Sequence, residues 1–149
     1  MHITQESPNQ SDVIAMLDQL DAYCGALYPA ESNHLMDVDS LTRSDVVFLV
    51  ARDGHGKAAA CGAFVNRGSY AEVKRMFVDP AFRGQGIGGA ILAEIILRAT
   101  QAGMTSLKLE TGISQPEAIA LYERDGFTRC PPFGEYQLDP LSLFMERSL

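Results

Sequence analysis

The glycine-rich stretch RGQGIGGAILAE, residues 83–94, is the feature that most restricts what this chain can fold into. It is followed at once by apolar residues spaced for one face of a helix. The first N–H groups of a helix have no partner within the helix, and glycine lets a ligand approach them without a Cβ in the way. The stretch therefore predicts an anion site, such as a pyrophosphate site, to which Arg83 adds a positive charge. A tight connection that binds nothing is the alternative.

Two common phosphate-binding motifs do not match this stretch. A P-loop requires Lys followed by Ser or Thr after the glycines, and neither follows here. A dinucleotide-binding fold requires a short strand-helix-strand unit with an acidic ribose-binding residue at a set distance, which is also missing. The glycines must therefore belong to another kind of fold.

Length and composition favour one globular domain over residues 1–149. The longest apolar run, 87–97, contains Glu94 and falls far short of the roughly 20 residues that span a bilayer. With no basic-then-apolar leader at the start, we expect a cytoplasmic protein without a membrane partner. The net charge of −7 disfavours nucleic acid and suits a neutral or cationic small partner.

The three cysteines do not have the spacing of a disulfide framework or a zinc site. We therefore expect a buried, unreactive thiol at each of Cys24, Cys61 and Cys130, and no metal.

Hydrophobic spacing and turn residues predict a mixed α/β domain. Helices are expected from Ser11 to before Pro29, with Val13, Leu17, Leu20 and Tyr23 on the apolar face, from the glycines to Gly103, and from Pro116 to Gly126. Strands are expected over 3–6, 46–51, 58–66, 71–78, 106–111, 127–129 and 143–147, and a loop or short helix over 30–44.

Two motifs in this order resemble the GNAT superfamily of acyl-CoA-dependent N-acetyltransferases. RGQGIG (83–88) has its Arg/Gln-x-x-Gly-x-Gly/Ala spacing, and VKRMFVDPAFRGQGIG (73–88) resembles the strand and proline turn that lead into it. AIALYERDGF (118–127) is similar to the helix that ends the family's core. The resemblance covers about residues 45–147. It implies an α/β (α+β) fold with a mixed, mostly antiparallel central sheet of about six to seven strands flanked by helices.

The resemblance also implies acetyl-CoA as co-substrate, with no metal. Its pyrophosphate is expected on the loop and helix start, at Arg83, Gly84, Gln85, Gly86, Ile87 and Gly88. The backbone of Met76, Phe77 and Val78 is expected to receive the pantetheine arm and polarise the acetyl carbonyl, at a point where two strands splay apart. Gln115 stands where the family often has Asn, which puts one polar contact to the cofactor in doubt.

The acceptor chemistry points to three further residues. An alkylammonium with a pKa near 10.4 must lose a proton before it attacks a thioester, so a carboxylate or an ordered water must accept that proton. Glu72 lies where some family members have their base, and Glu110 on the neighbouring strand is the second candidate. The alternative for Glu72 is a solvated strand carboxylate paired with Lys74 or Arg75. Tyr122 matches the family's tyrosine that protonates the departing thiolate, with a core tyrosine as its alternative.

Several side chains are candidates for the acceptor site, each with an ordinary surface role as the alternative: His34, Arg43, Arg75 and the loop 131–140. The sequence thus predicts transfer of an acetyl group from acetyl-CoA to the primary amine of a small molecule or amino acid, by direct attack. A protein N-terminal or lysine N-acetyltransferase and a non-catalytic CoA-binding sensor are the alternatives. The sequence does not identify the acceptor or the quaternary state, for which a homodimer is one option.

Overall fold

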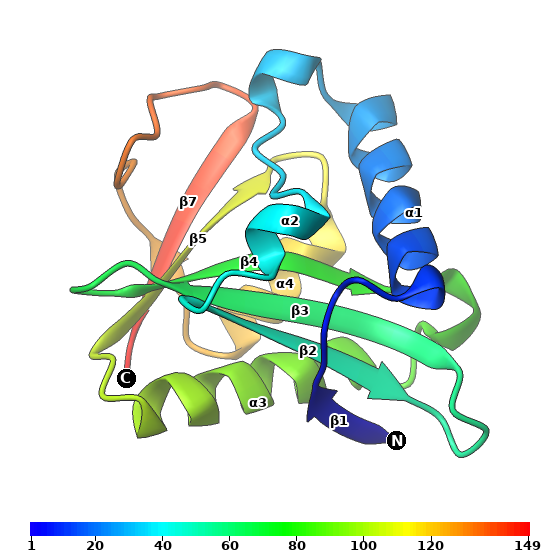
Figure 1. The fold of residues 1–149 in the computed structure, drawn as a ribbon. Helices are drawn as coiled ribbons and strands as arrows, with labels where there is room; N and C mark the ends of the chain where they lie inside the picture. The colour runs from blue at the N-terminus through cyan, green and yellow to red at the C-terminus, as the bar shows by residue number, and fades with distance from the viewer.

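One seven-stranded sheet organises the computed structural model, which describes residues 1–149. Its strands lie in the order β1-β2-β3-β4-β5-β7-β6 (Figure 1). Every neighbouring pair is antiparallel except β4 and β5, which are parallel. The expected fold class is confirmed. The strands are β1 (His2–Gln5), β2 (Val46–Arg52), β3 (Ala58–Asn66), β4 (Ala71–Val78), β5 (Ser106–Gly112), β6 (Thr128–Arg129) and β7 (Ser142–Ser148).

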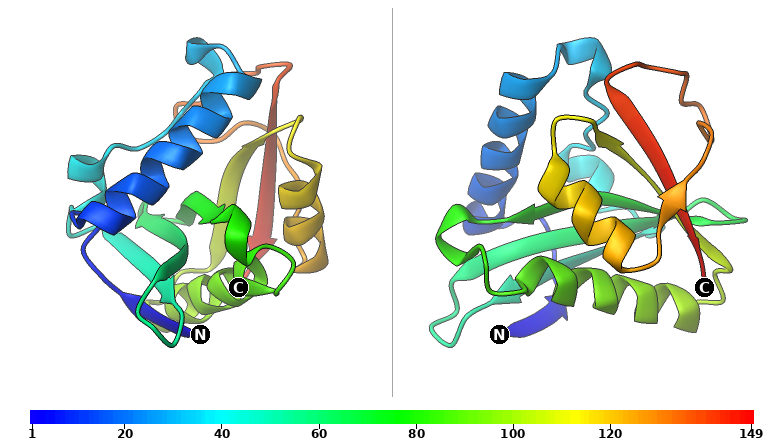
Figure 2. Two further views of the ribbon diagram at one scale, coloured as in Figure 1. Left: turned by 90° about the vertical axis from the view of Figure 1, so that its right-hand side faces the viewer. Right: turned by 180° about the vertical axis from the view of Figure 1, so that it is seen from behind.

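Helices cover both faces of the sheet (Figure 2). Helices α1 (Ser11–Leu27) and α2 (Val38–Leu41) lie on one face, and α3 (Ile87–Gln101) and α4 (Pro116–Arg124) lie on the other. Each face has its own apolar cluster, one beneath α1 and α2 and one beneath α3 and α4. None of the helices combines the length and apolarity needed to cross a bilayer.

Most expected elements agree with the structure to within a residue or two, but two details of the buried set were wrong. Tyr23 is 38% exposed, because the apolar face of α1 continues from Leu20 to Cys24 instead. Cys24 and Cys61 are buried as expected, whereas Cys130 is only half-buried because it follows the short edge strand β6. No group of three or more His, Cys, Asp or Glu side chains has the arrangement of a metal site.

A β-bulge in β4 lies close to the point where β4 and β5 stop pairing. Arg75 has a left-handed backbone (φ 59°), and the register between β3 and β4 shifts beside it. On its other side β4 pairs with β5 only at Ala71 and Glu72. Beyond Glu72 the two strands part, which confirms the expected splay and opens a cleft in the middle of the sheet.

Gly62 on β3 lets α3 lie close to the sheet beside that bulge. A Cβ at Gly62 would lie 2.5 Å from Sδ of Met76 and 2.6 Å from Cγ2 of Ile91. Gly62→Ala is therefore expected to lower the free energy of unfolding by about 1–3 kcal/mol through overpacking. Urea unfolding measures the loss. Gly54→Ala, in an exposed turn where a Cβ meets nothing within 4 Å, is the control and should change stability by less than about 0.5 kcal/mol. Equal stability of the two variants would contradict this packing.

Candidate active site

The splayed strands enclose a cleft of about 660 Å³ that runs from the glycine loop to α1. It collects most of the residues expected from the sequence. Those that line it are Met76, Phe77, Val78, Arg83, Gly84, Gly86, Ile87, Gly88, Glu110, Gln115 and Tyr122. Gln85, whose side chain is exposed, and Glu72 do not line it.

The glycine loop presents a row of unused backbone donors to this cleft. Arg83 N–H donates to the carbonyl of Pro80, and Ala90 N–H donates to the carbonyl of Gly86. None of the N–H groups between them, at residues 84–89, has an acceptor within the protein. Gly84 (φ 78°) and Gly86 (φ 76°) have left-handed backbones that glycine adopts without strain. The loop is therefore built to hold an anion of several oxygens, and a pyrophosphate fits it.

Arg83 adds its charge at the junction of this loop with β4. Its side chain is exposed, and its Nε donates to the carbonyl of Val78 over 3.2 Å. The β4 edge from Val73 to Val78 has no strand partner on the side of β5. An extended ligand that carries amides can hydrogen-bond to such an edge as an added strand would. A pantetheine arm has this chemistry, so the cleft fits both the pyrophosphate and the pantetheine arm of CoA.

Gln115 takes part in a contact that joins the two walls of the cleft. Its Oε1 accepts hydrogen bonds from Gly112 N–H (3.3 Å) and from the hydroxyl of Tyr28 (3.2 Å). That hydroxyl also accepts a hydrogen bond from Ser114 N–H over 3.1 Å. Tyr28 was not predicted from the sequence, because its partners lie more than 80 residues away. Only the amide nitrogen of Gln115 is left to contact a cofactor.

Glu110 and Tyr122 lie where the strands part. Glu110, on β5, is half-buried, and burial raises the pKa of its carboxyl above the ordinary range. Tyr122, on α4, is buried with its ring edge-on to Phe127, at 5.7 Å between centroids. Burial raises the pKa of the Tyr122 hydroxyl, and the charge of Glu110 raises it further. A carboxyl and a hydroxyl whose pKa values are both raised by burial thus line one cleft.

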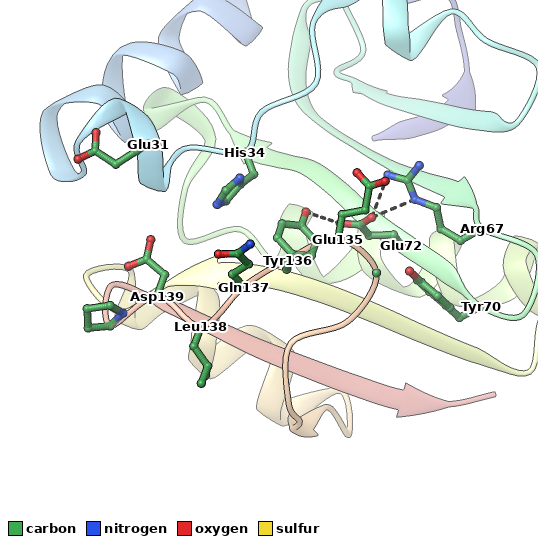
Figure 3. A pocket seen from close by; sticks show the side chains of 12 residues that line it. Glu31, His34, Arg67, Tyr70, Glu72, Glu135, Tyr136, Gln137, Leu138 and Asp139 are labelled. Atoms are coloured by element: carbon green, nitrogen blue, oxygen red, sulfur yellow. Dashed lines mark hydrogen bonds and ion pairs between the residues drawn. The ribbon is translucent and has the colours of Figure 1, made fainter.

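Glu72 lies in a closed network rather than in the cleft (Figure 3). It is 2% exposed, so the alternative of a solvated carboxylate was wrong. Its Oε1 accepts a hydrogen bond from Nε of Arg67 (3.1 Å) and forms an ion pair with Nη2 of the same arginine (3.0 Å), while its Oε2 accepts from the Tyr136 hydroxyl (2.6 Å). Lys74, one of its two expected partners, lies 3.7 Å away, whereas Arg75 pairs with Asp21. The carboxylate of Glu72 therefore has few free lone pairs with which to accept a proton.

A second cavity of about 780 Å³ lies on the α1 face of the sheet, over Glu72 (Figure 3). The loop between β6 and β7 forms one wall with residues 134–140, which include most of the loop expected to bound the acceptor. Carboxylates outnumber basic side chains in its lining, where Glu31, Glu72, Glu135 and Asp139 face a single arginine, Arg67.

Lys74 separates the two cavities. Its Nζ donates to the carbonyl of His34 (2.6 Å) and to the hydroxyl of Tyr136 (3.0 Å). Burial lowers the pKa of this ammonium, although Glu72 and Glu110 oppose that shift. His34 lines both cavities and is exposed, while Arg43 is exposed and lines neither. The role of Lys74 was not predicted, because both of its acceptors come from distant loops.

The glycine loop gives a prediction about acetyl-CoA affinity. Gly86→Val is expected to weaken acetyl-CoA binding by well over tenfold, or about 1.4 kcal/mol or more, since a branched side chain would enter the space in front of the free N–H groups. Gly56→Val is a matched control: Gly56 has nearly the same backbone (φ 79°) and the same open space, in a turn away from the cleft. Calorimetric titration with acetyl-CoA should show the loss of affinity for Gly86→Val and not for Gly56→Val. Equal affinities in the two folded variants would contradict the pyrophosphate assignment.

Comparisons with known proteins agree with this geometry. Residues 44–129 match the family model of the acetyltransferase (GNAT) domain. An "IAA acetyltransferase" from Azospirillum brasilense is 50% identical over 149 residues, which cover 99% of this chain and 97% of that protein. A crystal structure of a Klebsiella pneumoniae protein classed as an acyl-CoA N-acyltransferase has a TM-score of 0.87 at 39% identity, covering 99% of this chain and 97% of the other.

The fold also extends to more distant proteins. An aminoglycoside 6'-N-acetyltransferase crystallised with coenzyme A has a TM-score of 0.72 at 14% identity, over 99% of this chain and 97% of that one. At this identity the likeness concerns the fold alone.

Proposed function

Because this chain belongs to the GNAT family of acetyl-CoA-dependent N-acetyltransferases, we propose that it acetylates the primary amine of a small molecule or amino acid. The observation that carries the proposal is the cleft itself. The unused N–H groups of residues 84–89, the free edge of β4, Glu110 and Tyr122 all belong to one cleft of about 660 Å³.

In this proposal each part of the cleft has one task toward acetyl-CoA. The N–H groups of the glycine loop bind the pyrophosphate, and Arg83 adds its charge there. The backbone of Met76, Phe77 and Val78 binds the pantetheine arm between the strands and polarises the acetyl carbonyl. When bound, acetyl-CoA supplies an acetyl group activated as a thioester.

Of the two carboxylates suggested by the sequence, the contacts favour Glu110 over Glu72 as the general base. Glu110 faces the cleft without an ion pair to a lysine or arginine, whereas Glu72 is bound by Arg67 and Tyr136. Glu110 takes the proton from the acceptor's ammonium, directly or through one water, and the neutral amine attacks the acetyl carbon. The C–N bond forms as the C–S bond breaks, and no covalent enzyme intermediate is needed.

Tyr122 acts on the leaving sulfur. A thiol has a pKa near 8.5, while burial raises the pKa of Tyr122 above its ordinary value of about 10. Full proton transfer from this tyrosine to the thiolate is therefore uphill. Its hydroxyl stabilises the departing thiolate chiefly as a hydrogen-bond donor.

The second cavity meets the cleft at His34, and as the acceptor's route to the cleft it supports a small acceptor. Its volume of about 780 Å³ lies within the usual range of small-molecule sites, roughly 300–1,000 Å³. The loop 134–140 closes one side of it, where a peptide would need an open groove. Its excess of carboxylates attracts a cationic amine.

A panel of amines, amino acids and peptides tests the proposal. The purified protein is incubated with acetyl-CoA and each acceptor, and CoA release is measured together with the mass of the product. We expect release with one or more small amines or amino acids and a mass gain of one acetyl group. Release with peptides alone would point to a protein acetyltransferase. Tight acetyl-CoA binding without release would point to a CoA sensor.

A further inference from the structure

Four basic side chains line the cleft, and two of them lie inside it. Arg83 and Arg124 are exposed, one on the glycine loop and the other at the end of α4. Lys74 and Arg75 are covered and lie on β4, the strand that carries the bulge. Only these two cations are placed to bind a group that enters the cleft from the α1 side.

Lys74 is already engaged by contacts within the protein. Its Nζ donates to the carbonyl of His34 (2.6 Å) and the hydroxyl of Tyr136 (3.0 Å), and Oε2 of Glu72 lies 3.7 Å away. Two of the three donors of this ammonium are thus hydrogen-bonded, and its charge is paired with Glu72. Lys74 therefore stabilises the wall between the two cavities.

Arg75 is different, because its guanidinium is incompletely paired. Its side chain is 2% exposed, and its Nη1 donates to Oδ1 of Asp21 on α1 over 2.6 Å. Its Nε is buried and has no hydrogen-bond partner, the one such side-chain atom in the protein. A buried donor without an acceptor costs about 1–3 kcal/mol. The left-handed backbone at Arg75 costs roughly 1–2 kcal/mol more.

Arg75 carries both of these free-energy costs and also lines the cleft. Such strain is typical of a residue positioned to bind a ligand. The bulge places Arg75 on the α1 face of the sheet, where its backbone carbonyl also accepts a hydrogen bond from Sγ of Cys61. Since Nη1 is bound to Asp21, the free side of the guanidinium is the one that carries Nε. That edge of an arginine matches the two oxygens of a carboxylate.

We propose that Arg75 binds the carboxylate of the acceptor, and that the acceptor is therefore an amino acid rather than a simple amine. The inference rests on the proposed function, since it assigns one end of the acceptor. Glu110 receives the proton of the ammonium end, while Arg75 holds the carboxylate end. Because α1 covers the guanidinium, the side chain or α1 must shift slightly as the carboxylate docks.

The test compares acceptors that differ only in the carboxylate. The kcat/KM for CoA release is measured with the common amino acids and with their carboxamides, using wild type, Arg75→Gln and Arg43→Gln. Arg43 is an exposed arginine that lines neither cavity and is the matched control. For the amino acid that reacts fastest, wild type and Arg43→Gln should have a higher kcat/KM with the acid than with its carboxamide. The amine of the carboxamide is less basic and loses its proton more easily, which by itself would favour the carboxamide. Arg75→Gln should reduce the preference for the acid by about 10- to 100-fold, the worth of a charge-assisted hydrogen bond.

Three results would overturn the inference. In the first, wild type acetylates acids and amides equally well; in the second, Arg75→Gln keeps the wild-type preference. Either result leaves the proposed function intact. A wild type that acetylates no amine at all would overturn the proposed function and this inference with it. If Arg75→Gln fails to fold, Arg75→Asn replaces it, because asparagine tolerates a left-handed backbone better.

Discussion

Glu110→Gln is expected to lower kcat by about 10²- to 10⁴-fold, the usual contribution of a positioned general base. Glutamine keeps the shape of the side chain but cannot accept the acceptor's proton. Because only the carboxylate is a base, the wild-type rate should rise with pH through the pKa of Glu110, which burial raises above the ordinary range. In Glu110→Gln that rise should disappear, which kcat measured across pH at saturating acetyl-CoA will show.

The fold should tolerate this substitution. A raised pKa means that the folded state holds the proton of Glu110 more tightly than the unfolded state does. Its contribution to stability is therefore full at low pH and is lost as pH rises through the folded-state pKa. At neutral pH the neutral glutamine should cost no stability, so a loss of rate cannot be ascribed to unfolding.

Glu72→Gln is the matched control for that experiment, because it changes the other carboxylate that the sequence suggests. It should keep the pH-dependent rise and instead lower the free energy of unfolding by about 1–3 kcal/mol, since it weakens the buried contacts to Arg67 and Tyr136. If Glu72→Gln loses the rise and Glu110→Gln keeps it, the base is Glu72.

Tyr122→Phe is expected to lower kcat by about 100-fold or more while acetyl-CoA affinity stays nearly unchanged. Phenylalanine keeps the ring and its edge-on contact with Phe127, so only the hydroxyl is lost. Steady-state kinetics and calorimetry measure the two effects separately.

Tyr23→Phe is the control, since Tyr23 also lines the cleft but is 38% exposed on α1. It should leave kcat within about twofold of wild type. A Tyr122→Phe variant as active as Tyr23→Phe would show that the thiolate leaves unassisted and that Tyr122 only fills the core.

The glycine loop, the strand before it and the helix around Tyr122 could be predicted from the sequence because their signals are local. Glycines before an apolar helical repeat specify an anion site within a few residues. The turn residues around β3 and the proline after β4 likewise locate these two strands at the observed bounds. The mixed, mostly antiparallel sheet and the splay came from the family resemblance rather than from these patterns.

The environments of Glu72 and Arg75 could not be predicted, because both depend on contacts between distant segments. Strict alternation would place Val73, Arg75 and Phe77 on one face of β4. The bulge at Arg75 breaks it, so that Val73 packs beneath α3 while Phe77 packs beneath α1. Glu72 is buried by Tyr136, a loop residue 64 positions later. No local pattern reports either arrangement.

A crystal structure of the protein with CoA tests the central claim most directly, namely that the cleft between β4 and β5 is the acetyl-transfer site. We expect pyrophosphate oxygens about 3 Å from N–H groups of residues 84–89, the pantetheine along Met76, Phe77 and Val78, and the sulfur within hydrogen-bond reach of the Tyr122 hydroxyl. CoA bound elsewhere, or bound here with its sulfur directed away from both Tyr122 and Glu110, would contradict it.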